Sequence, residues 1–150
     1  MTLAAAALSA TGAAAQNFPG GPGVVVMAGK CAKLLVVKLD ASKDCKGELA
    51  TVTAPDGTVT FIFSSGGKML GFEGDGRSIG PAGKGSVRLP LEVVSTGVGT
   101  KLTGQVKAAG FCTFGNPFAG KPTVVECTAE TKTANFAATF HTDGKPPRRR

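Results

Sequence analysis

The sequence predicts an all-β protein, either a single-domain β-sandwich or a small β-barrel of about eight or nine short antiparallel strands with two disulfides. Glycine supplies 22 of the 150 residues, about twice its average share, and glycine is unfavourable in helices but common in turns. Apolar and polar residues alternate at period two in several segments, which is typical of half-buried strands. After residue 15, no segment repeats apolar residues at helical spacing for three turns.

The composition changes along the chain and predicts its organisation. Residues 1–15 form an uncharged run of small apolar residues, and Ala13 and Ala15 occupy the −3 and −1 positions of an A-x-A cleavage site before Gln16. We interpret this run as the remnant of a secretory signal peptide without its positively charged region; the alternative is a disordered alanine-rich leader. The remaining segments are a Gly/Pro-rich lead-in with a first strand (16–29), the all-β domain (30–144) and a basic, disordered tail (145–150).

Four cysteines behind a predicted export signal indicate disulfides. Structural zinc sites usually pair ligands two to four residues apart, whereas these cysteines are separated by much longer gaps, so a metal is not expected. Cys112 lies among three phenylalanines, and apolar surroundings raise a thiol pKa, which disfavours a nucleophilic role. Four cysteines allow three connectivities. We favour the one in which each disulfide brackets one strand–loop–strand unit, which gives Cys31–Cys45 and Cys112–Cys127.

Residues 48–63 give the strongest local signal, a hairpin. Two β-rich runs flank the turn tripeptide Pro55-Asp56-Gly57, a sequence with turn chemistry. Val59, Phe61 and Phe63 alternate with polar residues and are expected to share one buried face.

Other strands follow the same alternation. Residues 87–93 place Val87, Leu89, Leu91 and Val93 on one face. Residues 101–108 place Leu102, Val106 and Ala108 opposite a cationic face, which predicts a half-buried strand. Residues 132–141 place Phe136, Ala138 and Phe140 together. Shorter candidates are 23–28, 33–39, 68–73 and 123–129.

The sequence offers little chemistry for catalysis. His141 is the only histidine, and its place opposite Phe140 predicts a solvent-exposed side chain. Glu73 and Asp75 are the tightest carboxylate pair, and a hydrolase using them is the less favoured alternative. We therefore expect no enzyme, no catalytic residue, no cofactor and no metal.

The net charge of +7 does not predict a nucleic-acid binder. Four basic residues lie in the tail, which leaves thirteen basic against ten acidic residues up to position 144. That part of the chain has two arginines and neither tryptophan nor tyrosine, whereas nucleic-acid surfaces combine basic and aromatic side chains. Only a weak contact of Arg148–Arg150 with anionic surfaces is expected.

A binding or structural module, secreted or periplasmic, is the predicted role. We expect it to bind an unidentified protein or envelope component through an exposed loop. The alternative is a β-barrel that carries a small apolar ligand in a phenylalanine-lined cavity. The residues predicted for partner binding are Phe111, Phe114, Asn116, Pro117 and Phe118.

Overall fold

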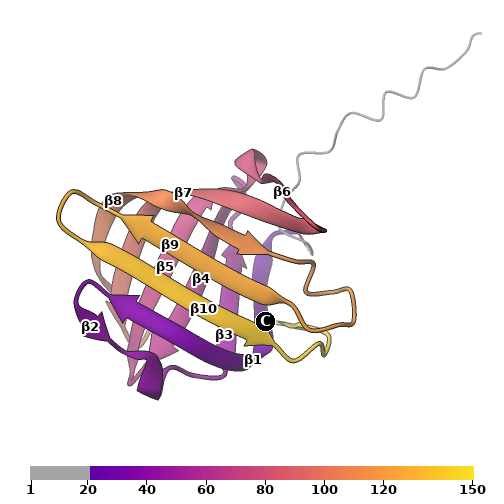
Figure 1. Ribbon diagram of the computed structural model, residues 1–150, viewed down its shortest axis with the longest axis horizontal. Coiled ribbons are helices and arrows are strands. Elements are labelled where there is room, and N and C mark those ends of the chain that lie inside the picture. The colour runs from indigo at the N-terminus through magenta and orange to yellow at the C-terminus, as the bar shows by residue number, and fades with distance from the viewer. Residues whose placement is uncertain (1–20) are drawn as a thin grey trace, which may run out of the picture.

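The protein is a closed antiparallel β-barrel with 67% of residues 21–150 in strands (Figure 1). The structure is a computed structural model that describes residues 21–150. The predicted signal peptide and the cleavage site before Gln16 therefore lie outside the described residues. The all-β prediction is confirmed, and of its two architectures the barrel is the one formed.

Eight strands follow one another around the barrel, each paired with the next, and the last pairs with the first. In this up-and-down order the first and last strands pair with each other, so neither is left as the edge strand of an open sheet. The barrel strands are β1 (Gly23–Val36), β3 (Glu48–Thr53), β4 (Thr58–Ser65), β5 (Lys68–Asp75), β7 (Ser86–Val98), β8 (Lys101–Phe114), β9 (Val124–Glu130) and β10 (Asn135–Thr142). The additional elements are β2 (Leu39–Asp40), β6 (Gly80–Gly83), β11 (Arg148–Arg149) and the 3₁₀ turns η1 (Ser42–Asp44) and η2 (Gly76–Ser78).

The predicted hairpin is strands β3 and β4. Its turn is fixed by Asp56, whose carboxylate accepts a hydrogen bond from the backbone N–H of Thr58 at 2.9 Å. Gly57 adopts a φ of 92°, a conformation that glycine adopts without steric cost. Val59, Phe61 and Phe63 point inward and are buried, as predicted.

Two strands depart from simple alternation because they contain bulges. In β7 the register shifts between Leu91 and Val93, so Val94 points inward in place of Val93 and is buried. In β1 the register shifts between Cys31 and Lys33, and the strand continues through this bulge. The predicted segment 23–28 and the first part of the predicted segment 33–39 therefore form one long strand. A bulge inserts one residue and exchanges the two faces beyond it, which alternation alone does not reveal.

Phenylalanine fills the barrel. The Phe61 and Phe114 rings lie 5.1 Å apart in a tilted arrangement, and the Phe63 and Phe72 rings lie 5.8 Å apart edge to face. Phe140 is also fully buried. Aromatic rings bury more surface than other side chains, and both separations are typical of favourable pairs.

Both predicted disulfides are present, Cys31–Cys45 and Cys112–Cys127. Each closes a loop of about 15 residues, a constraint worth roughly 3 kcal/mol in the chain-entropy description. Cys31 belongs to β1, and Cys45 precedes β3. Cys112 and Cys127 join β8 to β9 inside the barrel.

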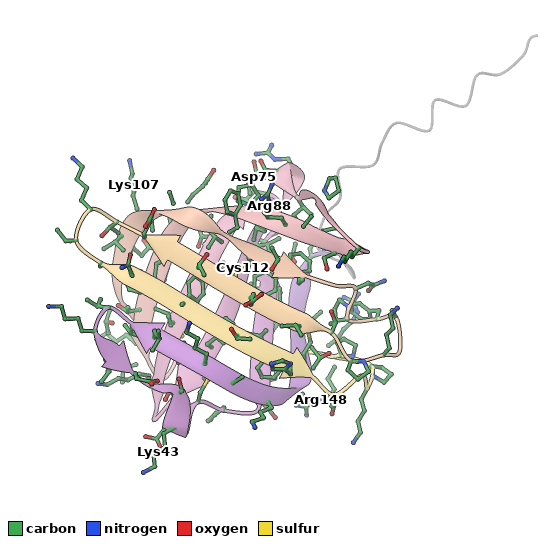
Figure 2. All side chains as sticks on the ribbon, viewed as in Figure 1. Lys43, Asp75, Arg88, Lys107, Cys112 and Arg148 are labelled. Atoms are coloured by element: carbon green, nitrogen blue, oxygen red, sulfur yellow. A yellow bond between two sulfur atoms is a disulfide. The ribbon has the colours of Figure 1, made fainter. Side chains whose placement is uncertain are left out.

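The basic C-terminal segment is partly ordered, which differs from the disordered tail we expected. Arg148 and Arg149 form β11 and pair with Val26 and Val25 of β1 (Figure 2). The Arg148 guanidinium also donates to the Glu48 carboxylate at 3.1 Å. Because β10 pairs with β1 only from Gly29 onward, the edge of β1 at Val25 and Val26 that faces away from β3 is open to the tail, and backbone pairing outweighs the charge of the tail locally.

Candidate functional site

The predicted partner-binding loop is less exposed than the sequence suggested. Phe114 is only 2% exposed and packs against Phe61 inside the barrel, and Pro117 is buried as well. Neither side chain is available to a partner. The place of Phe114 in the core follows from β8, which directs every second residue inward at this end.

Three of the five predicted residues remain at the surface. Phe111 is 43% exposed and points outward, with the Arg88 guanidinium 4.4 Å above its ring. Phe118 is 38% exposed, and its N–H donates to the Asn116 side chain at 2.9 Å. The two exposed rings belong to different local structures, a strand and a turn.

Glu73 and Asp75 lie at the end of β5 and are held by different neighbours. The Asp75 carboxylate accepts two hydrogen bonds from the Arg77 side chain, at 2.9 Å each, and one from its backbone N–H. The guanidinium first, and the N–H second, lower the pKa of Asp75. Thr60 donates to Glu73 at 3.4 Å. Asp75 is therefore an ionised residue that caps η2.

His141 does not join this pair. It is exposed on β10, and β10 is four strands from β5 in either direction around the closed barrel. Glu73 and His141 therefore lie on opposite sides of the molecule. The structure does not bring His141 together with the Glu73 and Asp75 pair of the hydrolase alternative.

An apolar groove with a volume of about 430 Å³ lies at one open end of the barrel. We call it the mouth groove. Its deepest lining residues, Leu34 and Leu70, belong to the buried core, whereas Leu39 and Val98 are 59% and 56% exposed. Its lining residues are Leu34, Val36, Leu39, Ala41, Ser65, Lys68, Met69, Leu70, Thr96, Gly97, Val98 and Thr103.

The turn beside this groove is strained. Val37 lies between the groove residues Val36 and Leu39 and adopts a φ of 61°. A β-branched residue in this left-handed region is unusual and costs energy. Strain of this kind concentrates at binding sites, where the surrounding structure imposes it.

The rim of the mouth groove is mainly cationic. Lys68 lines the groove itself, and the turns at the same end of the barrel carry further lysines. The acidic residue of β2 is Asp40, and its carboxylate accepts hydrogen bonds from the hydroxyl and the N–H of Ser42. These bonds lower the pKa of Asp40. The lysines of this end are Lys38, Lys43, Lys46, Lys68, Lys101 and Lys132, and the acids are Asp40, Asp44, Glu48 and Glu130.

Sequence reasoning did not find the mouth groove, because its residues come from strands far apart in the chain. A local signal existed in two places. Leu39 and Val98 are apolar residues beside turns, where polar residues are usual. Their convergence depends on the closure of the barrel.

Within residues 21–150, no group of three metal-ligating side chains is placed to hold an ion. The same part of the chain has no helix long and apolar enough to cross a membrane. No protein family, curated protein or solved structure matches this chain.

Proposed function

We propose that this protein is an exported, non-enzymatic binding module that holds a small amphipathic anion in the mouth groove. The hydrocarbon part of the ligand lies against Leu39, Met69 and Val98, and its acidic head lies near Lys68. The observation that carries the proposal is an apolar groove of about 430 Å³ with a lysine on its lining.

The size and chemistry of the groove support this ligand class. Small-molecule sites usually have volumes of about 300–1,000 Å³ and a mostly apolar lining with few polar groups. Leu39 and Val98 expose more than half of their surface, and grouped apolar exposure is typical of binding sites. Because phenylalanines fill the interior, the ligand binds at the barrel mouth rather than in the internal cavity considered from the sequence.

Export is supported by the two disulfides, because such bonds persist in oxidising compartments. Mass spectrometry of the exported protein under non-reducing conditions tests it. We expect a chain that begins at Gln16 and contains no free thiol. A chain retaining residues 1–15, or four reduced cysteines, would contradict export.

A binding role is favoured over catalysis by the separation of Glu73 and His141 on opposite sides of the barrel. The partner-binding loop has less support than the mouth groove. Burial of Phe114 and Pro117 leaves only separated aromatic contacts there.

Calorimetric titration of the oxidised protein with decanoate tests the proposed ligand class. We expect saturable binding that weakens at least about fivefold in Leu39→Ser and Val98→Ser, because each removes apolar contact. Both side chains are exposed, so neither change should unfold the protein. Leu102→Ser is the matched control, since Leu102 is 51% exposed but does not line the mouth groove, with which its patch on the outer face shares only Met69.

The head group is tested with Lys68→Gln and with decyltrimethylammonium. The variant should weaken decanoate binding at low salt and leave decanol binding unchanged. The cationic surfactant should bind more weakly than decanoate to the unchanged protein. Absence of decanoate binding, or equal loss in Leu102→Ser and Val98→Ser, would refute the proposal.

A further inference from the structure

The barrel contains a strand whose edge is only partly paired. β8 pairs with β7 along its whole length, from Lys101 to Phe114, but it pairs with β9 only from Ala109 onward. Among residues 21–150, the segment 101–108 therefore pairs on one side only. We call this segment the free edge of β8. Unpaired strand edges are templates for pairing with another chain.

The free edge exists because the neighbouring hairpin turns early. β9 ends at Glu130, and the N–H of Thr131 donates to the carbonyl of Ala134 at 2.8 Å. The Thr131 hydroxyl accepts hydrogen bonds from the N–H groups of Thr133 and Ala134 at 3.2 and 3.0 Å. These bonds close the turn and prevent β9 from continuing along β8.

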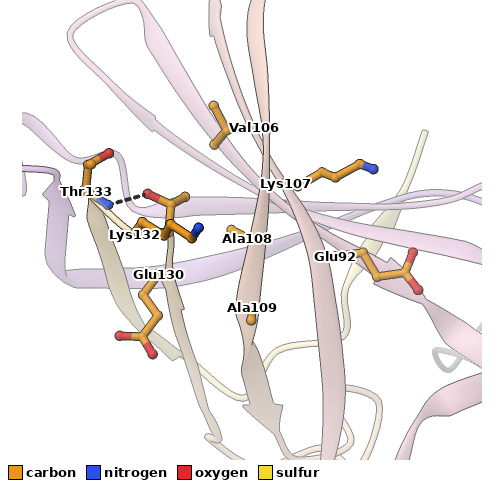
Figure 3. A pocket seen from close by; sticks show the side chains of 9 residues that line it. Glu92, Val106, Lys107, Ala108, Ala109, Glu130, Lys132 and Thr133 are labelled. Carbon is orange, nitrogen blue, oxygen red and sulfur yellow. Dashed lines mark hydrogen bonds between the residues drawn. The ribbon is translucent and has the colours of Figure 1, made fainter.

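An open cleft of about 780 Å³ lies between the free edge and this turn (Figure 3). Val106 lies in it and is 45% exposed, although its partner in β7, Val94, is only 1% exposed. Ala108 lies beside Val106 on the same cleft and contacts the core. Val106 and Ala108 therefore lie on the inner face of β8 at a point where no neighbouring strand within residues 21–150 covers them.

The charge of the free edge restricts what pairs with it. Residues 101–108 include Lys101 and Lys107 and no acidic residue. Lys132 lies across the cleft, while Glu92 and Glu130 lie at its margins. Pairing two copies through this edge would bring four lysines together with no acidic residue of the segment 101–108 between them. Like charges destabilise strand pairs, so a second copy is disfavoured and an acidic strand is favoured.

We propose that the free edge of β8 binds an extended acidic peptide segment of another protein by strand addition. The added strand pairs with the backbone of residues 101–108. Its apolar side chains cover Val106, and its carboxylates lie on the face of Lys107, while Lys101 lies beyond the bulge at Thr103. In this mode, backbone hydrogen bonds supply affinity and alternate side chains supply specificity. The site meets the mouth groove at Thr103, but it binds through the backbone edge and does not depend on the ligand proposed for the groove.

Amide hydrogen exchange of the oxidised protein tests strand addition directly. The probe is an acetylated and amidated octapeptide in which valine alternates with glutamate or threonine. We expect exchange to slow at least about tenfold at alternate amides within residues 101–108. The same peptide with alternate backbone nitrogens methylated should not bind, because it lacks the donors of one edge.

Charge reversal provides the second arm. Lys101→Glu combined with Lys107→Glu should weaken binding of the octapeptide at least about tenfold and allow a version with lysine in place of glutamate to bind. Lys121→Glu with Lys145→Glu is the matched control, because both lysines are exposed and lie outside the free edge. Leu39→Ser should leave peptide binding unchanged while it weakens decanoate binding.

Three results would overturn the proposal. One is unchanged exchange within residues 101–108 at saturating peptide. Another is equal binding of the methylated peptide. The third is dimerisation of the protein alone through residues 101–108, seen as a concentration-dependent sedimentation coefficient that Lys101→Glu alters, because a second copy would then be the occupant.

Discussion

Cys112 and Cys127 lie directly opposite each other on paired strands, with their Cα atoms 4.0 Å apart and both side chains completely buried. Their disulfide therefore joins two neighbours that the barrel already holds together. Cys31–Cys45 differs, because Cys45 is only partly buried and precedes β3. The two disulfides should respond differently to a reductant, since thiol–disulfide exchange requires access to a sulfur atom.

We expect Cys31–Cys45 to be reduced first under native conditions. A short treatment with a phosphine reductant, followed by alkylation and peptide mass spectrometry, measures the order. Cys112 and Cys127 should become alkylated only when denaturant opens the barrel. Simultaneous labelling of all four cysteines without denaturant would contradict this order.

Phe114→Ala should destabilise the protein by about 3–5 kcal/mol, because it removes a buried ring and leaves a cavity beside Phe61. Urea denaturation followed by circular dichroism measures the change. Phe118→Ala is the control within the same segment. Its ring is 38% exposed, so the loss should be much smaller. Equal losses would mean that Phe114 is not a core residue.

Gly110→Ala should cost about 1–3 kcal/mol through overpacking. A methyl group at Gly110 would overlap the carbonyl oxygen of Thr128 on the neighbouring β9. The methyl carbon is fixed to the backbone of β8 and the oxygen belongs to the backbone of β9, so the overlap is relieved only by shifting a strand. Gly80→Ala is the comparison, because its methyl group would meet no atom within 4 Å. We expect the denaturation midpoint to fall for the first variant and to stay for the second.

Val37→Asn should stabilise the protein by about 1 kcal/mol. Val37 has a φ of 61°, and asparagine tolerates this conformation better than a β-branched residue does. The same denaturation experiment measures the gain. Val52→Asn, at a partly buried strand position, should instead lose stability, since asparagine is unfavourable in strands. A loss in Val37→Asn would show that the turn is not strained.

The periodicity of the sequence predicted the fold class and most inward-facing residues. Val59, Phe61 and Phe63, and likewise Phe136, Ala138 and Phe140, are buried as the alternation indicated. The disulfide pairing was also predicted correctly, because each pair spans one local unit. These features depend on neighbours within about fifteen residues.

Features that depend on distant pairing were not predictable. Leu102 was expected on a half-buried face with Val106, but a register shift between Thr96 and Gly97 turns Leu102 to the outer surface. Val106 points inward yet stays exposed, because β9 ends before it. The mouth groove and the free edge of β8 both result from unequal strand lengths around the barrel. The barrel itself closes through the pairing of β1 with β10, which lie more than a hundred residues apart in sequence.

The carboxylate of Asp75 should titrate below the ordinary aspartate pKa of about 3.9. The Arg77 guanidinium is the main cause, and the Arg77 backbone N–H is the second. Carbon-13 NMR of the side-chain carboxyl group measures the value. In Arg77→Ala the pKa should rise but remain below the ordinary value, because the N–H stays at the same position. An unchanged pKa in this variant would mean that the guanidinium does not hold Asp75.

The same interaction sets the direction of a pH effect on stability. Because the pKa of Asp75 is lower in the folded state than in the unfolded state, its contribution is fully present above pH 3.9 or so. The contribution disappears as the pH falls through the lower folded-state pKa. Denaturation midpoints at pH 7 and pH 2 should therefore differ less in Asp75→Asn than in the unchanged protein. The side chains of Arg77 and Asp75 are 69% and 28% exposed, so the difference should be small and should shrink further in 1 M salt. A larger acid sensitivity in Asp75→Asn would reverse the predicted sign and refute the pairing.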